Sequence, residues 1–152
     1  MPNRRQALAQ GATLMGLLAV AGLLPGRAQA AWNAQAFEAK SLAEALKALG
    51  LAMPVESKEV VLKATDIAEN GAVVPLELSC SAPGAKRLMV LVEKNPSALA
   101  AVFELSDAVE AAVNTRVKMG QTSKVYAVAQ KADGTLIYAQ KEIKVTLGGC
   151  GG

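Results

Sequence analysis

Short apolar segments with alternating side chains fill residues 58–146, and this pattern restricts the fold more than any other feature of the sequence. Leu76, Leu78 and Cys80 face one way along the segment 73–80, as expected for a half-buried β-strand. Turn signals rich in glycine, proline and asparagine separate such segments, so we expect about seven strands. They are predicted at 60–67, 73–80, 87–93, 101–105, 114–119, 124–130 and 135–147.

These strands follow one another without a helical period between them, which favours an antiparallel β-sandwich. We therefore expect a mostly β domain, immunoglobulin-like, at residues 31–146. A helix at 106–113 remains open as an alternative for that stretch. Ahead of the strands, Leu42 and Leu46 lie on one apolar stripe at helical spacing. This stripe predicts one N-terminal helix at 34–49, packed on the sandwich.

Composition excludes several classes of function. The chain has 16 basic and 13 acidic residues, but Arg4, Arg5 and Arg27 lie in the first 30 residues, which contain no acid. The remaining 13 basic residues balance the 13 acidic ones, so the basic footprint of a nucleic-acid-binding protein is missing. Histidine is absent and there are two cysteines. We therefore expect no catalytic residue, no metal site and no bound cofactor.

Residues 1–30 have the organisation of a signal peptide. A charged start precedes the apolar stretch 11–24, whose 14 residues are too few for a membrane span of about 20 residues. Small residues at positions 28 and 30 predict cleavage between Ala30 and Ala31. We expect an exported protein without a stable membrane anchor.

The arginine pair in this leader resembles the twin-arginine export signal. Leu8 fits the usual pattern, whereas Asn3, Ala7 and Ala9 do not. General secretion therefore stays open as the alternative route. Twin-arginine export carries folded proteins, so a partner protein could travel to the periplasm with this chain.

The C-terminal segment 147–152 places Cys150 between two pairs of glycines. These glycines are Gly148, Gly149, Gly151 and Gly152. Because glycine tolerates most backbone conformations, we expect the segment to be a mobile arm with a reach of about 20 Å. No cation or histidine adjoins Cys150 in the sequence to activate the thiol. The thiol is therefore expected to be an attachment point for a substrate that other enzymes process.

The two cysteines also have simpler interpretations. Cys150 could be an incidental residue of a disordered tail. Cys80 shares the apolar face of a predicted strand, so a core thiol is the main interpretation. A disulfide between Cys80 and Cys150, or an interface role for Cys80, stays open.

The C-terminus resembles that of the SoxY family of sulfur-oxidation carrier subunits. This family ends in valine-threonine, one variable residue and Gly-Gly-Cys-Gly-Gly, as residues 145–152 do. Further stretches agree across the mature chain, at 68–71, 74–75, 93–96 and 133–134. The sequence departs from the family in its incomplete twin-arginine pattern and in the additional Cys80.

The resemblance implies a fold and a set of partners. It implies an immunoglobulin-like subunit that forms a heterodimer with a SoxZ-like partner and carries covalent intermediates of thiosulfate oxidation on Cys150. A haem-containing enzyme would couple thiosulfate to the thiol, a metal-dependent hydrolase would release sulfate, and a sulfane dehydrogenase would oxidise the remaining sulfur. The carrier itself would have no autonomous catalysis.

Two rival functions follow from the same tail. A ubiquitin-like sulfur carrier ends in Gly-Gly and is loaded at its terminal carboxylate, but the leader and Cys150 argue against that class. A periplasmic β-sandwich module for binding or assembly would use Cys150 to form an intermolecular disulfide. The sequence leaves this second alternative open.

Overall fold

The computed structural model describes residues 33–149. The predicted signal peptide, its cleavage site at Ala30 and Ala31, and the terminal residues 150–152 lie outside the described residues.

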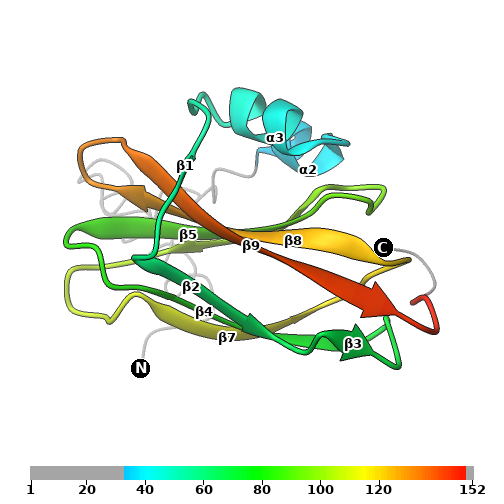
Figure 1. The fold of residues 1–152 in the computed structure, drawn as a ribbon. Helices are drawn as coiled ribbons and strands as arrows, with labels where there is room; N and C mark the ends of the chain where they lie inside the picture. The colour runs from blue at the N-terminus through cyan, green and yellow to red at the C-terminus, as the bar shows by residue number, and fades with distance from the viewer. Residues whose placement is uncertain (1–32, 150–152) are drawn as a thin grey trace, which may run out of the picture. The chain divides into compact units, whose positions relative to one another are not determined.

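Two β-sheets face each other in this domain (Figure 1). The larger sheet has the strand order β1-β9-β8-β5-β6, with β3 beside β9, and the smaller sheet has the order β2-β4-β7. The larger sheet contains β1 (Val55–Glu56), β3 (Ile67–Ala68), β5 (Ala85–Val92), β6 (Leu99–Glu104), β8 (Ser123–Lys131) and β9 (Leu136–Val145). The smaller sheet contains β2 (Val60–Ala64), β4 (Val74–Cys80) and β7 (Ala112–Val117).

The strand pairing confirms the predicted mostly β sandwich. The long strands pair in antiparallel fashion, whereas the two-residue strands β1 and β3 both run parallel to β9. The alternative of a helix at 106–113 is wrong. A loop follows β6, and β7 begins at Ala112 within that stretch.

Alternating side chains of both sheets fill the space between them. In β4, Val74, Leu76 and Leu78 are buried, as the sequence pattern predicts. Val90 of β5 and Ala127 of β8 approach this cluster from the opposite sheet. Because this inner layer removes apolar surface from water along both sheets, it stabilises the sandwich.

A second apolar cluster lies on the outer face of the larger sheet, beneath two helices (Figure 1). Met89 and Leu91 of β5 and Val128 of β8 point to this side and pack with Leu46. The strand β5 is therefore buried on both faces, which explains why its sequence is a continuous apolar run rather than an alternating one.

The predicted single helix at 34–49 is wrong in its continuity, because the structure has two short helices, α2 (Ala34–Glu38) and α3 (Leu42–Ala48). Ser41 caps α3, with its hydroxyl accepting a hydrogen bond from the Glu44 N–H at 3.2 Å. The Glu44 carboxylate accepts from the Lys40 N–H at 3.0 Å. Satisfying these backbone N–H groups starts a new helix and breaks the preceding one.

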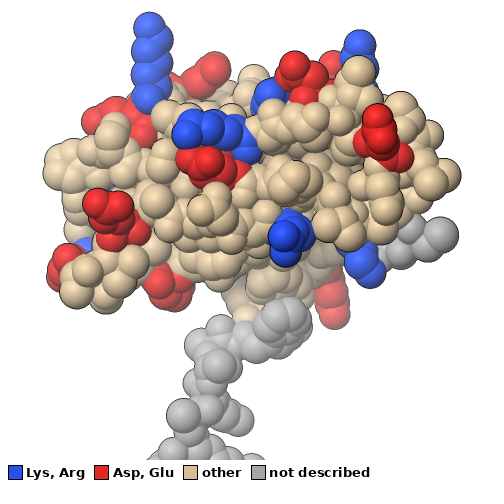
Figure 2. Space-filling model, turned by 90° about the horizontal axis from the view of Figure 1, so that it is seen from below, with Lys and Arg blue, Asp and Glu red and all other residues tan. Residues whose placement is uncertain are grey.

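Charged side chains of both signs are interspersed on the face seen in Figure 2. Among the described residues, cross-strand ion pairs include Lys63 with Glu77 at 2.7 Å and Arg87 with Glu104 at 2.7 Å. Such exposed pairs contribute little to stability. This distribution agrees with the equal numbers of basic and acidic residues in 31–152.

Candidate functional site

The predicted attachment residue Cys150 and its neighbours Gly151 and Gly152 lie outside the described residues. The structure does place the other two glycines of the motif, Gly148 and Gly149, in the segment that follows the end of β9 at Val145. These residues form the base of the predicted arm.

Backbone hydrogen bonds hold the chain after β9. The Thr146 N–H donates to the Ala68 carbonyl at 3.1 Å, and the Leu147 carbonyl accepts from the Gly71 N–H at 2.7 Å. The Gly149 N–H donates to the Met119 carbonyl at 3.0 Å. The structure therefore differs from the expectation of a free arm that begins at residue 147.

Close packing at Gly148 and Gly149 explains why the structure shows contact where the sequence predicts mobility. Gly149 is buried, and a Cβ atom added to it would lie 2.7 Å from the backbone N of Ala72. A Cβ atom on Gly148 would lie 2.3 Å from the carbonyl oxygen of Gly120. At these two positions the missing side chain permits backbones to approach each other. In the sequence alone, these glycines indicate conformational freedom, because their packing partners are distant along the chain.

Cys80, the second cysteine, is a free thiol at the end of β4. Its side chain is half-buried and packs against the inner cluster, as the core-thiol interpretation expects. Burial raises the pKa of the Cys80 thiol, and the Glu59 carboxylate adds to this effect, while the Ala82 backbone and Lys131 oppose it. Cys80 is therefore a poor nucleophile at neutral pH.

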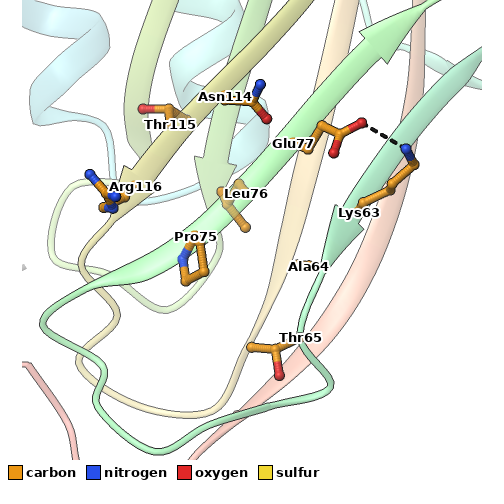
Figure 3. Close-up of a pocket in the computed structure, with 9 residues that line it drawn as sticks. All are labelled: Lys63, Ala64, Thr65, Pro75, Leu76, Glu77, Asn114, Thr115 and Arg116. Carbon is orange, nitrogen blue, oxygen red and sulfur yellow. Dashed lines mark hydrogen bonds and ion pairs between the residues drawn. The ribbon is translucent and has the colours of Figure 1, made fainter.

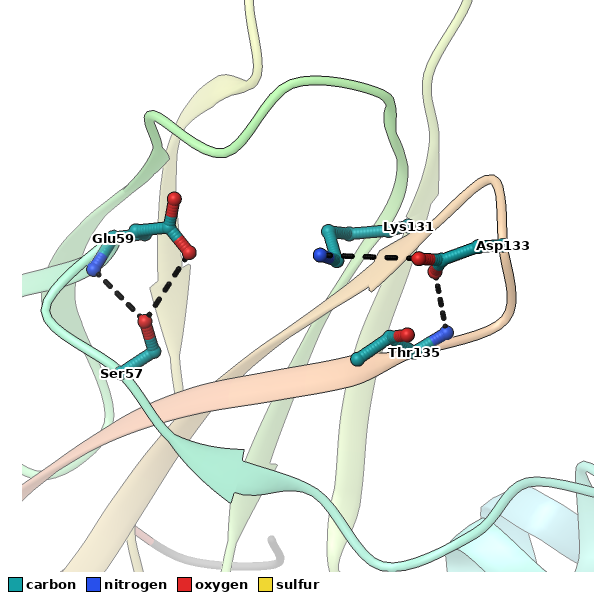
Figure 4. A network of polar contacts seen from close by, with 5 residues as sticks. All are labelled: Ser57, Glu59, Lys131, Asp133 and Thr135. Atoms are coloured by element: carbon teal, nitrogen blue, oxygen red, sulfur yellow. Dashed lines mark hydrogen bonds and ion pairs between the residues drawn. The ribbon is translucent and has the colours of Figure 1, made fainter.

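The charged groups nearest to this thiol have their own partners (Figure 4). The Ser57 hydroxyl donates to the Glu59 carboxylate at 3.4 Å, and the Lys131 Nζ lies 3.9 Å from the Asp133 carboxylate. The Thr135 N–H donates to Asp133 at 2.8 Å, and this hydrogen bond lowers the pKa of that carboxyl. This arrangement ties turns together and leaves no base directed at the Cys80 sulfur among the interactions of the described residues.

Cys80 and the base of the arm lie at opposite ends of β4. Gly149 contacts Ala72, which precedes the strand, whereas Cys80 is its last residue. About 20 Å of extended strand separates Val74 from Cys80, at about 3.3 Å per residue. Disulfide-bonded cysteines have Cα atoms within about 7 Å. A bridge between Cys80 and Cys150 is thus incompatible with the observed position of Gly149.

An open groove of about 720 Å³ crosses β2, β4 and β7 (Figure 3). Its polar lining includes the Lys63–Glu77 ion pair and Arg116. The residues of the arm base do not line this groove. The groove is therefore separate from the described base of the arm.

Residues 33–149 contain neither a metal-binding cluster nor a membrane-spanning helix. Within this range, no group of three or more His, Cys, Asp or Glu side chains is arranged to hold a metal ion. No helix within the same range is long and apolar enough to cross a membrane.

A family model for the sulfur oxidation protein SoxY matches residues 46–150, which is more than half of the chain. The chain belongs to the SoxY family. The matched range covers the whole sandwich and extends to the position of Cys150. Membership in SoxY supports a carrier role in sulfur oxidation.

One solved structure agrees with this assignment, and another shares only the fold. The sulfur carrier protein SoxY from Chlorobium limicola f thiosulfatophilum is 35% identical, with a TM-score of 0.57 over 63% of this chain and 87% of that chain. A superoxide reductase (neelaredoxin) from Ignicoccus hospitalis is 18% identical, with a TM-score of 0.51 over 59% of this chain and 82% of that one. This second likeness shows the fold alone. Among curated proteins, none matches the chain.

Proposed function

We propose that this SoxY-family chain is a covalent carrier of sulfur intermediates in periplasmic thiosulfate oxidation, with the substrate attached to the thiol of Cys150. The observation that carries the proposal is the family match, which runs through residue 150, the position of a cysteine between two pairs of glycines. The similar Chlorobium protein is described as a sulfur carrier.

Loading is an oxidation. The Cys150 thiolate and thiosulfate form a sulfur–sulfur bond, which gives a cysteine S-thiosulfonate and releases two electrons. A haem-containing partner enzyme takes these electrons. Hydrolysis by a metal-dependent partner then releases sulfate and leaves a sulfane sulfur, which a sulfane dehydrogenase oxidises before the next hydrolysis.

The carrier depends on these partners because its own residues supply little chemistry. The sequence has no histidine, and residues 33–149 contain no metal-binding cluster. A SoxZ-like subunit completes the proposed heterodimer. The signal-peptide pattern of residues 1–30 supports cleavage between Ala30 and Ala31 and export to the periplasm. The arginine pair favours the twin-arginine route.

Intact-mass measurement tests this function. The protein is isolated from thiosulfate-grown cells, its mass is recorded without reductant, and fragmentation locates any added group. We expect a mass increase equal to a thiosulfate, sulfonate or sulfane group on Cys150, removed by reductant. If the sole modification of Cys150 is a disulfide to another protein, the result would support an assembly module and contradict the carrier.

A further inference from the structure

Three chain segments meet at the base of the arm, at residues 70–72, 118–120 and 147–149. A ring of backbone hydrogen bonds joins them, in which Gly71 N–H donates to Leu147 O at 2.7 Å and Met119 N–H donates to Gly71 O at 2.7 Å. Gly149 N–H donates to Met119 O at 3.0 Å and closes the ring. We call these three segments the glycine clasp.

Steric contact makes the clasp dependent on particular glycines. A Cβ atom on Gly71 would lie 2.2 Å from the Met119 carbonyl oxygen, and one on Gly148 would lie 2.3 Å from the Gly120 carbonyl oxygen. Neither glycine is among the described residues with a positive φ angle, so glycine is required here for space and not for backbone conformation. Gly120 differs, because a Cβ atom there meets nothing within 4 Å.

The clasp has a support on its inner side. Asn95, whose side chain is nearly buried at 9% exposure, donates through Nδ2 to the Lys118 carbonyl at 2.7 Å. Its Oδ1 accepts from the Gly120 N–H at 3.3 Å. The amide therefore spans the loop that receives Gly149, and it fixes that loop from a turn far away in the sequence.

Side-chain burial does not explain the attachment of 147–149. The Leu147 side chain is 66% exposed, although its carbonyl group is hydrogen-bonded. Strand pairing does not explain the attachment either, because the register of β3 with β9 ends at Val145. The clasp is a separate contact made by backbone groups after the last strand, and such a contact can open without disturbing the sandwich.

We propose that the glycine clasp positions the base of the carrier arm, with Asn95 as a positioning residue that holds its receiving loop. This inference rests on the proposed carrier function of Cys150. Consecutive Cα atoms are about 3.8 Å apart, so a fixed Gly149 restricts where the attachment residue can lie. Opening the clasp adds three residues, or about 10 Å, to the reach of the arm.

Amide hydrogen exchange on the full-length chain tests the clasp without any sulfur chemistry. Gly148→Ala introduces the collision with Gly120, and Gly120→Ala places the same methyl group in open space of the same clasp. We expect Gly148→Ala to accelerate exchange of the Gly149 and Gly71 amides at least ~10-fold, with Val128 of the sandwich unchanged. The Gly120→Ala control should exchange as the parent does.

A spin label on Cys150, in a Cys80→Ala background, gives the readout that concerns the arm itself. Gly148→Ala and Asn95→Ala should increase the mobility of the label, while Gly120→Ala should not. Unchanged exchange and unchanged label mobility in Gly148→Ala would overturn the proposal, as would an equal effect of Gly120→Ala. Failure of every variant and of the parent to accept sulfur would contradict the carrier function instead, while these two readouts would still decide the clasp.

Discussion

Cys80 and Cys150 are assigned different roles: Cys80 is a packed thiol, and Cys150 is the proposed attachment thiol. Cys80 packs against the inner cluster, and burial raises its pKa. Cys150 follows the buried Gly149 at the other end of β4 and is the proposed attachment residue. Because Cys80 and Gly149 lie at opposite ends of β4, we interpret Cys80 as a structural residue.

Alkylation should distinguish these thiols. A raised pKa lowers the thiolate fraction at pH 7, and half-burial hinders access, so we expect Cys80 to react with iodoacetamide ~10-fold more slowly than Cys150. The difference should shrink as the pH rises toward the pKa of Cys80. Mass spectrometry of the alkylated peptides measures both rates. Equal rates at pH 7 would contradict the assignment of Cys80 as a packed thiol.

Replacing the packed thiol should affect stability alone. Cys80→Ala removes a half-buried sulfur atom from the inner cluster, so we expect a loss of about 1 kcal/mol in the free energy of unfolding. Urea unfolding measures this loss, and the loading of thiosulfate by partner enzymes should stay at the parent rate. A folded Cys80→Ala protein that no longer loads sulfur would place Cys80 in the functional site.

The glycines show where residue-level prediction reached its limit. The tail motif predicted the SoxY family, whose model matches through residue 150, while the attachment role of Cys150 stays a prediction. The clasp could not be predicted, because the partners of Gly149 are Met119 and Ala72. Only the folded sandwich brings these distant residues together, and glycine in a sequence indicates freedom and close packing equally well.

At the scale of elements, the helical region contains two patterns that predict different structures: a continuous apolar stripe and two helix-capping residues, Asn33 and Ser41. The apolar stripe predicts a continuous helix, whereas the Ser41 hydroxyl caps α3 and the Glu44 carboxylate accepts from the Lys40 N–H just before it. The Asn33 side chain caps α2 by accepting from the Ala36 N–H at 3.1 Å. Two caps in one helical stretch predict two helices, so the break could have been identified from the sequence.

Removing the cap of α3 should lower stability, because the Glu44 N–H loses its hydrogen bond to the Ser41 hydroxyl. We expect Ser41→Ala to lower the free energy of unfolding by about 1 kcal/mol. The exposed loop residue Ser106 provides a control, since Ser106→Ala should change stability by less than about 0.5 kcal/mol. Urea denaturation of both variants checks the expectation, and equal midpoints would show that the cap does not stabilise α3.

Strand prediction succeeded where one face is buried and was less exact elsewhere. In β4 the alternation of Val74, Leu76 and Leu78 gives the inner face directly. The predicted start of β7 at residue 114 is two residues late, and the two-residue strand β3 was merged with β2. Their pairing depends on β4 and β9, which a local pattern does not contain.

At the scale of the whole molecule, the sandwich holds the base of the proposed carrier arm through backbone hydrogen bonds. The inner cluster joins the two sheets, and the second cluster attaches α2 and α3 to the larger sheet. The arm base leaves the domain beside β3 and the loop after β7. This organisation suits a protein that presents a bound group to other proteins.

The isolated protein should have no turnover. Its sequence lacks histidine, and its described residues contain no group of three or more His, Cys, Asp or Glu side chains placed to hold a metal ion, so we expect oxidation and hydrolysis to depend on partner enzymes. Purified protein is mixed with thiosulfate and an electron acceptor, and sulfate is measured. Sulfate formation at a steady rate without partner enzymes would contradict the carrier account.

The most direct test of the central claim is transfer of radiolabelled thiosulfate sulfur to the chain by the partner enzymes. The parent, Cys80→Ala and Cys150→Ser proteins are compared, with folding of each checked by circular dichroism. An alcohol cannot form the sulfur–sulfur bond, so we predict reductant-sensitive label on the parent and on Cys80→Ala, and none on Cys150→Ser. Label retained on folded Cys150→Ser protein would contradict the assignment of Cys150 as the attachment residue.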